Sequence, residues 1–144
     1  MPNTTVRILT VDGIQYYYDQ TRLKTLSIPR VYLRAGTHRR TVTNEYLQLE
    51  GGQPAMTVGD DLLRDATITG ITANCETSHT WAVKVFKKGV AIPLITFNLA
   101  SQNHKEDSSL NVDVDKGSVL LFKVEGISIP FPRLFLELAW RVTV

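Results

Sequence analysis

Residues 133–142 read RLFLELAWRV, and this stretch decides the fold class of the chain. Apolar side chains occupy every second position, namely Leu134, Leu136, Leu138, Trp140 and Val142. Arg133, Glu137 and Arg141 occupy positions of the opposite parity. Successive side chains of a strand point to opposite faces, whereas those of a helix repeat about every 3.6 residues. We therefore predict a half-buried β-strand that places Trp140 in the core.

The same alternation recurs upstream. In TWAVKVFKKG (80–89), Trp81, Val83 and Val85 share one face of a predicted strand that ends at Lys88-Gly89. VAIPLITFNLA, which follows directly, predicts a further strand that is broken or bulged at its proline. Both stretches have the composition of strands rather than of helices.

Two neighbouring stretches complete the reading of the C-terminal half. ATITGITANC (66–75) is rich in β-favouring residues, and strict alternation places Ile68 and Gly70 on one face and Ile71 on the other. SQNHKEDSS (101–109) is polar throughout and predicts a loop. Short strands separated by Gly, Pro, Asn and Asp turns, without a helical period, predict an all-β fold: an antiparallel β-sandwich or jelly roll.

The N-terminal part predicts a hairpin followed by an extended arm. TTVRILTV and IQYYYD flank Asp12-Gly13, a dipeptide favoured in two-residue hairpin turns. Pro29 lacks a backbone N–H, so LSIPRVYLRAG (26–36) predicts an edge strand or an extended arm. We therefore divide the chain into an N-terminal hairpin and attachment arm, a linker or long loop that can form a short helical turn at DDLLRD, and a sandwich module. The expected bounds are 1–50, 51–66 and 67–144.

Composition limits the classes of function. The 144 residues suit one domain with 43% hydrophobic and 21% charged residues, an ordinary globular balance. No apolar stretch approaches the roughly 20 residues of a membrane span, and the N-terminus lacks the pattern of a signal peptide, so we expect no membrane insertion. Cys75 is the single cysteine and cannot form an internal disulfide, which fits synthesis in a reducing cytosol.

Basic residues are concentrated in residues 22–40, which contain no acidic residue. They can face phosphate or an acidic protein surface, or form solvated strand faces and an intersubunit arm. The formal net charge of only +2 and the absence of a nucleic-acid motif argue against nucleic-acid binding. We expect residues 20–41 to form a docking arm outside the sandwich core. The candidate attachment residues are Arg22, Lys24, Arg30, Arg34, Arg39 and Arg40.

NVDVDKGSVLLFKVEG (111–126) offers the most plausible acidic site. A calcium-binding loop of the EF-hand type needs a glycine at its sixth position and a glutamate at its twelfth. With Asp113 at the first position, Gly117 comes one residue too early and Glu125 one residue too late. We interpret Asp115-Lys116-Gly117 as a turn between two strands, with Asp113 facing outward.

Other reactive side chains have simpler interpretations as structural groups. The histidines lack metal-site spacing and are interpreted as surface residues: His38, His79 and His104. A nucleophilic pair of Cys75 with His79 is possible in principle, but a core or loop cysteine is the simpler reading. Asp60, Asp61 and Asp65 could form a carboxylate cluster, but the stretch GDDLLRD reads equally well as a solvated turn. No phosphate-binding glycine loop or nucleophile elbow occurs, so we expect no catalytic, cofactor or metal site.

The pattern of residues 66–144 resembles a module of tailed-bacteriophage virion proteins, which recurs in tail fibres, baseplate adhesins, head fibres and capsid decoration proteins. The resemblance depends on the TITGITA strand, the WAVKVFKKG strand with its glycine turn, and a polar loop before LNVDVDKGSVLLFKVEG. A proline-bearing loop and the closing strand FLELAWRV complete the pattern. Residues 1–50 have no counterpart in this resemblance.

The resemblance implies a small antiparallel sandwich that assembles as a homotrimer and is not an enzyme. It implies a structural protein exposed on the virion and made in the host cytoplasm, with capsid, portal or tail components as partners and no cofactor. The alternative is an adhesin of the tail or baseplate that binds a host surface receptor. A glycan-active enzyme is the third hypothesis.

Overall fold

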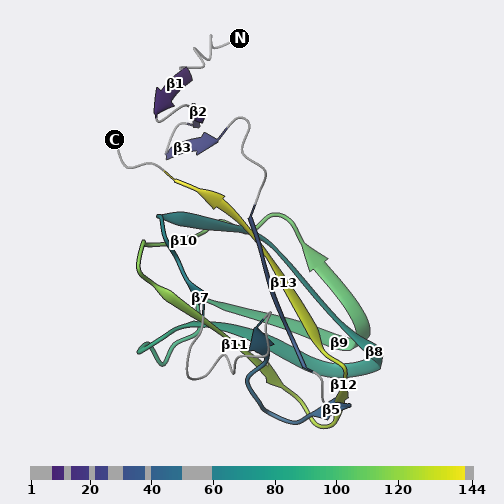
Figure 1. Ribbon diagram of the computed structural model, residues 1–144. Coiled ribbons are helices and arrows are strands. Elements are labelled where there is room, and N and C mark those ends of the chain that lie inside the picture. The colour runs from purple at the N-terminus through teal and green to yellow at the C-terminus, as the bar shows by residue number, and fades with distance from the viewer. Residues whose placement is uncertain are drawn as a thin grey trace, which may run out of the picture.

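The chain is all-β in the part that the computed structural model describes (Figure 1). The described residues are 8–11, 14–19, 22–25, 31–37, 40–49 and 60–141. They contain no helix, and their strands pair antiparallel throughout, which confirms the predicted fold class. The strands are β1 (Ile8–Val11), β2 (Ile14–Asp19), β3 (Arg22–Thr25), β4 (Val31–Gly36), β5 (Thr41–Val42), β6 (Gln48–Leu49), β7 (Asp60–Asp61), β8 (Ala66–Lys87), β9 (Ile95–Asp107), β10 (Val112–Val114), β11 (Val119–Glu125), β12 (Ile129–Pro130) and β13 (Arg133–Trp140).

Strand β8 connects the two layers of the sandwich-like fold. Its first part, 66–74, pairs with β13 on one side and with β10 and the end of β9 on the other. Its second part pairs with β11 and with the start of β9. The long β8–β9 ribbon therefore curves through both layers, as Figure 1 shows. The two stretches that the sequence predicted as separate strands, 66–75 and 80–89, are parts of this one strand, which ends at the predicted glycine turn.

A β-bulge in β8 changes the predicted faces. Glu137 of β13 lies opposite Gly70, and the next residue, Leu138, lies opposite Ile68, so Thr69 is an extra residue on β8. An extra residue reverses the alternation of a strand at that point. Ile68 and Ile71 are consequently both buried in the core. The prediction that they lie on opposite faces is therefore wrong.

The polar stretch SQNHKEDSS belongs largely to a strand, not to a loop. Strand β9 continues through it to Asp107, and His104–Asp107 pair with Ile71–Asn74 of β8. Most side chains of this half of β9 are exposed on both faces, so the hydrophobic pattern of a half-buried strand is absent. The backbone ladder to β8 forms without it, and a positive φ of 51° at Ser101 marks the bend of the ribbon.

The sandwich begins before the predicted boundary at residue 67. Strand β4 pairs with β13 from Val31 to Ala35 and with β6 on its other side. Residues 31–36 therefore form an inner strand of the sheet, contrary to the prediction that residues 20–41 are a separate arm. In the predicted linker, β7 pairs with β11, and Leu62 is buried where a helical turn was expected. Pro29 and residues 50–59 lie outside the described residues.

Strands β1, β2 and β3 form a separate three-stranded sheet. Val11 pairs with Ile14 across residues 12–13, so the predicted hairpin is confirmed. The sheet lies at the end of the sandwich where β13 ends, and β3 contacts β13 (Figure 1). Strands β5 and β12 lie at the opposite end of the molecule.

The core lies between the layers and joins β8, β11 and β13. Trp81 is only 3% exposed, as the alternation in β8 predicted. The predicted apolar face of β13 is confirmed for Leu134, Leu136 and Leu138, which are fully buried. Trp140 packs against this core but is only partly buried, because it lies at the end of the strand.

Candidate functional site

The four predicted attachment residues within the described part of the chain belong to different elements. Arg34 lies on β4, where its guanidinium carbon is 5.6 Å from the centre of the Phe135 ring. Arg40 is exposed beside β5, whereas Arg22 and Lys24 belong to β3 at the other end of the molecule (Figure 1). The two remaining candidates, Arg30 and Arg39, lie outside the described residues.

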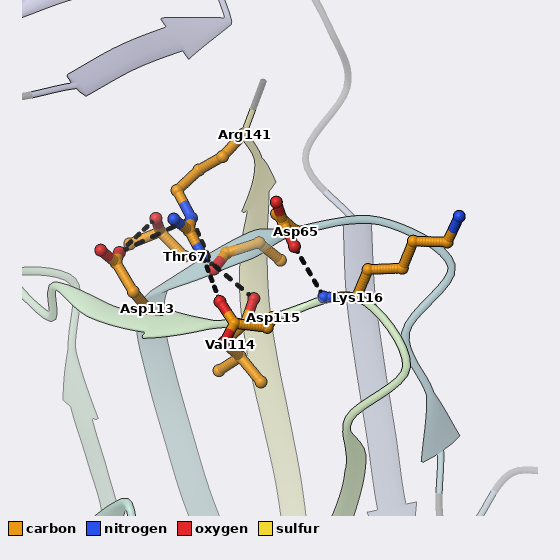
Figure 2. A network of polar contacts seen from close by, with 8 residues as sticks. Asp65, Thr67, Asp113, Val114, Asp115, Lys116 and Arg141 are labelled. Atoms are coloured by element: carbon orange, nitrogen blue, oxygen red, sulfur yellow. Dashed lines mark hydrogen bonds and ion pairs between the residues drawn. The ribbon is translucent and has the colours of Figure 1, made fainter. Parts of the chain in front are cut away.

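The two aspartates of NVDVDKGS take part in a network around Arg141 (Figure 2). Arg141 Nε donates to the carbonyl of Ala66 at 3.1 Å, and Nη2 donates to the carbonyl of Val114 at 3.2 Å. The carboxylate of Asp115 lies 3.4 Å from Nη2, and that of Asp113 lies 3.8 Å from Nε. The Arg141 guanidinium thus contacts two carbonyls and two carboxylates at the edge where β8, β10 and β13 meet.

Further bonds fix the turn that follows β10. The Thr67 hydroxyl donates to Asp113 Oδ1 at 2.8 Å, and Asp65 Oδ1 accepts the backbone N–H of Lys116 at 2.7 Å. Gly117 has a φ of +80°, which side-chain-bearing residues rarely adopt. The interpretation of Asp115-Lys116-Gly117 as a turn is therefore confirmed, and the carboxylates serve as structural acceptors. Among the described residues, no group of three or more His, Cys, Asp and Glu side chains is arranged to hold a metal ion.

Cys75 and His79 each interact with Thr77. The Cys75 thiol donates to the Thr77 carbonyl at 3.0 Å, and His79 Nε2 lies 3.0 Å from the Thr77 hydroxyl. Burial raises the pKa of the Cys75 thiol, which opposes formation of a nucleophilic thiolate. The core reading of Cys75 is thus confirmed. His104 is exposed beside Glu106, as predicted, whereas His38 lies outside the described residues.

A loop at the β5–β12 end exposes apolar side chains on a braced backbone. We call residues 126–132 the tip. The side chain of Ile127 is 77% exposed and that of Phe131 is 39% exposed. Large exposed apolar side chains that lie close together are typical of contact surfaces.

The tip is joined to residues 40–44 by the pairing of β12 with β5 and by four further hydrogen bonds. The backbone N–H of Asn44 donates to the Gly126 carbonyl at 3.2 Å, and the Gly126 N–H donates to the Asn44 side chain at 3.0 Å. The Ser128 N–H donates to the Thr43 hydroxyl at 2.8 Å. The Phe131 N–H donates to the Arg40 carbonyl at 3.0 Å. These bonds hold the tip in one conformation.

Several residues of the tip and of the adjoining segment 40–44 have unusual backbone conformations. Asn44, Ser128 and Phe131 have φ values of 47°, 51° and 44°, in the left-handed region that costs residues with side chains energy. Gly126 is packed so closely that a Cβ atom there would lie 2.9 Å from side-chain atoms of Ile129 and Trp81. Strain of this kind persists only where the surrounding contacts enforce it, so the tip is a preformed surface.

A second surface feature lies on the outward face of the β4–β13–β8 sheet. Two rows of residues cross the strands there: Tyr32, Glu137 and Gly70 in one row, and Arg34, Phe135 and Thr72 in the next. A cavity of about 220 Å³ lies on this face beside the end of β9, where a Cβ atom at Gly70 would lie 3.3 Å from the Asp107 carbonyl oxygen. We call this cavity the outer pocket; its lining includes Tyr32, Gly70, Glu106, Asp107, Phe135 and Glu137.

The outer pocket is acidic. Hydrogen bonds from the Ser109 hydroxyl and from its backbone N–H, at 2.6 and 2.8 Å, hold the pKa of Asp107 below its usual value. Glu137 Oε1 accepts the Thr69 hydroxyl at 2.8 Å, and the Tyr32 hydroxyl lies 3.4 Å from Glu137 Oε2. The pocket therefore combines carboxylates with an exposed aromatic ring, a combination that suits cationic groups and polyols.

Sequence reasoning identified neither surface. The tip had a visible signal, because ISIPFP places apolar residues in a proline-containing loop where no strand face can bury them all. The outer pocket had none, because Tyr32, Gly70 and Glu137 come together only through the register of three strands.

None of the described residues forms a helix of the length and hydropathy that a membrane span requires. No protein-family model matches the chain, and comparisons with curated proteins and with solved structures give no significant match.

Proposed function

We propose that this protein is a non-enzymatic structural component of a tailed-phage virion, exposed on the particle and assembled as a homotrimer. The resemblance of residues 66–144 to virion modules supports the proposal. The β8 strand, the turn at Gly117 and the closing strand β13, on which that resemblance depends, occur as strands and a turn of one sandwich-like fold.

The observation that carries the proposal is the preformed tip. A chain that acts alone gains nothing from holding Ile127 and Phe131 in water on a strained and braced loop. A protein that assembles buries such side chains against a neighbour, and a preformed surface reduces the entropy lost on association. The structure of the tip is therefore better suited to assembly than to catalysis.

The opposite end of the molecule supplies the attachment surface in this proposal. The β1–β3 sheet adjoins the sandwich at the end of β13, away from the tip (Figure 1). Its strand β3 contains Arg22 and Lys24, two of the predicted attachment residues. Capsid, portal or tail components are the proposed partners of this sheet.

Two measurements test the proposal. Light scattering of the purified chain should give about 49 kDa, three times the chain mass of 16.2 kDa. Mass spectrometry of gradient-purified particles from the source culture should detect the chain in stoichiometric amounts relative to the major capsid protein. A chain that stays monomeric at micromolar concentration, or that is absent from the particles, would contradict the proposal.

The alternative is a host-receptor-binding adhesin, and the outer pocket favours it. Carboxylates beside an exposed tyrosine ring can hydrogen-bond and stack on a sugar. Binding to a glycan array that is lost in Tyr32→Ala, with Tyr46→Ala as a control on the other layer, would support the adhesin. Equal binding by both variants would place the receptor site elsewhere.

A further inference from the structure

The outer pocket and the tip complement each other chemically. The pocket presents the carboxylates of Glu106, Asp107 and Glu137 beside the rings of Tyr32 and Phe135, and the Arg34 guanidinium lies 5.6 Å from the centre of the Phe135 ring. Carboxylates gathered in one place repel one another, and an incoming cation relieves that repulsion. An aromatic ring beside them attracts the same cation and also offers apolar contact.

The tip and the neighbouring residue Arg40 present the matching groups. Ile127 and Phe131 expose apolar surface, and the Arg40 side chain is exposed as well. The backbone N–H of Phe131 donates to the Arg40 carbonyl at 3.0 Å, so the two backbones are neighbours at this end of the molecule. Arginine is among the residue types enriched at the energetic centres of protein interfaces.

The tip and the outer pocket of one chain are held apart by the sheet. Arg133 begins β13 directly after the tip, whereas Glu137 lies in the middle of that strand. Four residues of strand cover about 13 Å. The tip is braced to residues 40–44 and the pocket is built on paired strands, so neither can move to the other. The two surfaces can therefore meet only between copies.

We infer that the tip of one copy docks into the outer pocket of the next, with Phe131 against Tyr32 and with Arg40 at the carboxylates of Glu106 and Glu137. This inference rests on the proposed homotrimer and names its interface. A ring of three copies needs two different surfaces on each chain, because a twofold contact that pairs a surface with itself closes at a dimer. The tip and the pocket supply that pair.

Charge reversal tests the interface. Arg40→Glu and Glu106→Arg should each weaken trimer formation at least tenfold, measured by sedimentation equilibrium at low salt, and the double variant should recover most of the loss. Glu106 suits the test because its side chain is 76% exposed and lies 3.9 Å from the exposed His104 ring. Lys116→Glu, an equal charge change on the exposed β10–β11 turn, serves as the matched control and should leave the trimer intact. Circular dichroism checks that each variant is folded.

A crosslink provides a second measurement that does not depend on charge. Ile127→Cys combined with Ser108→Cys should form covalent oligomers of up to three chains under mild oxidation, while each single variant should stay at the monomer band. Cys75 is buried and should not contribute. A wild-type trimer that is insensitive to the charge reversals and to oxidation would overturn the interface and leave the trimer standing. A wild-type monomer would overturn both.

Discussion

Arg141→Ala removes the cation at the centre of the network in Figure 2 and tests whether that network holds the edge of the sandwich together. The guanidinium donates to the carbonyls of Ala66 and Val114 at 3.1 and 3.2 Å. Hydrogen bonds that involve a charged group contribute about 1.5–3 kcal/mol each. The Arg141 side chain is 19% exposed, so water can replace part of this contribution in the variant.

The carboxylates add little to the expected loss. Asp113 and Asp115 are 49% and 78% exposed, and exposed ion pairs contribute about 0–1 kcal/mol. Allowing for hydration of the two carbonyls, we expect Arg141→Ala to lower the free energy of unfolding by about 3 kcal/mol. For a chain of this size that corresponds to a fall in Tm of roughly 10 °C.

Thermal and urea denaturation followed by circular dichroism measure the effect. Arg141→Lys should fall between the parent and Arg141→Ala, because an ammonium group is a point charge and cannot donate as a planar fork. Lys116→Ala is the matched control, since it removes a cation from the same turn whose backbone N–H, not its side chain, bonds Asp65. If Arg141→Ala melts within about 1 °C of the parent, the network does not stabilise the fold and the reasoning fails.

Three further predictions follow from the packing. Gly126→Ala should lower the free energy of unfolding by about 1–3 kcal/mol, because the new Cβ would lie 2.9 Å from atoms of two side chains. Gly89→Ala should lower it by only about 1 kcal/mol, because Gly89 has a φ of +84° but open space around it. Urea titrations measure both changes. The folded Cys75 thiol has a raised pKa, so it keeps its proton to higher pH than the unfolded thiol. The thiol therefore contributes fully to stability below its unfolded pKa of about 8.5, and this contribution is lost as the pH rises through the higher pKa of the folded state. Urea denaturation at pH 8 and at pH 10 should show this loss in the parent and not in Cys75→Ala. Deletion of residues 1–41 removes β4 from between β13 and β6 and should abolish cooperative thermal unfolding, whereas deletion of residues 1–25 should preserve it. Cooperative unfolding of the chain that lacks residues 1–41 would show that β4 is dispensable.

The features of the fold that could be predicted depend on short stretches of adjacent residues. The alternation around Trp81 and Leu136 depends only on which residues prefer burial, and the structure buries both. The hairpin across residues 12–13 and the turn at Gly117 depend on the conformations that short segments favour. Each of these features can be read from a few adjacent residues.

The wrong predictions share a different cause, because they concern strands whose partners are far away in the sequence. Strand β4 was interpreted as an arm, yet its pairing with β13 joins residues about a hundred positions apart. The polar half of β9 has no buried face, so only its hydrogen bonds to β8 make it a strand. Neither partner is visible in a local pattern.

The bulge at Thr69 connects these errors to the candidate site. Without the extra residue, strict alternation would send either Ile68 or Ile71 out of the core, so burial of both requires it. The same bulge sets Gly70 opposite Glu137, and its Thr69 hydroxyl holds the Glu137 carboxylate at 2.8 Å. The glycine allows the end of β9 to lie close by, since a Cβ atom at Gly70 would be 3.3 Å from the Asp107 carbonyl oxygen, and both residues line the outer pocket. One inserted residue thus keeps both isoleucines in the core and sets Gly70 opposite Glu137, two residues that line the outer pocket.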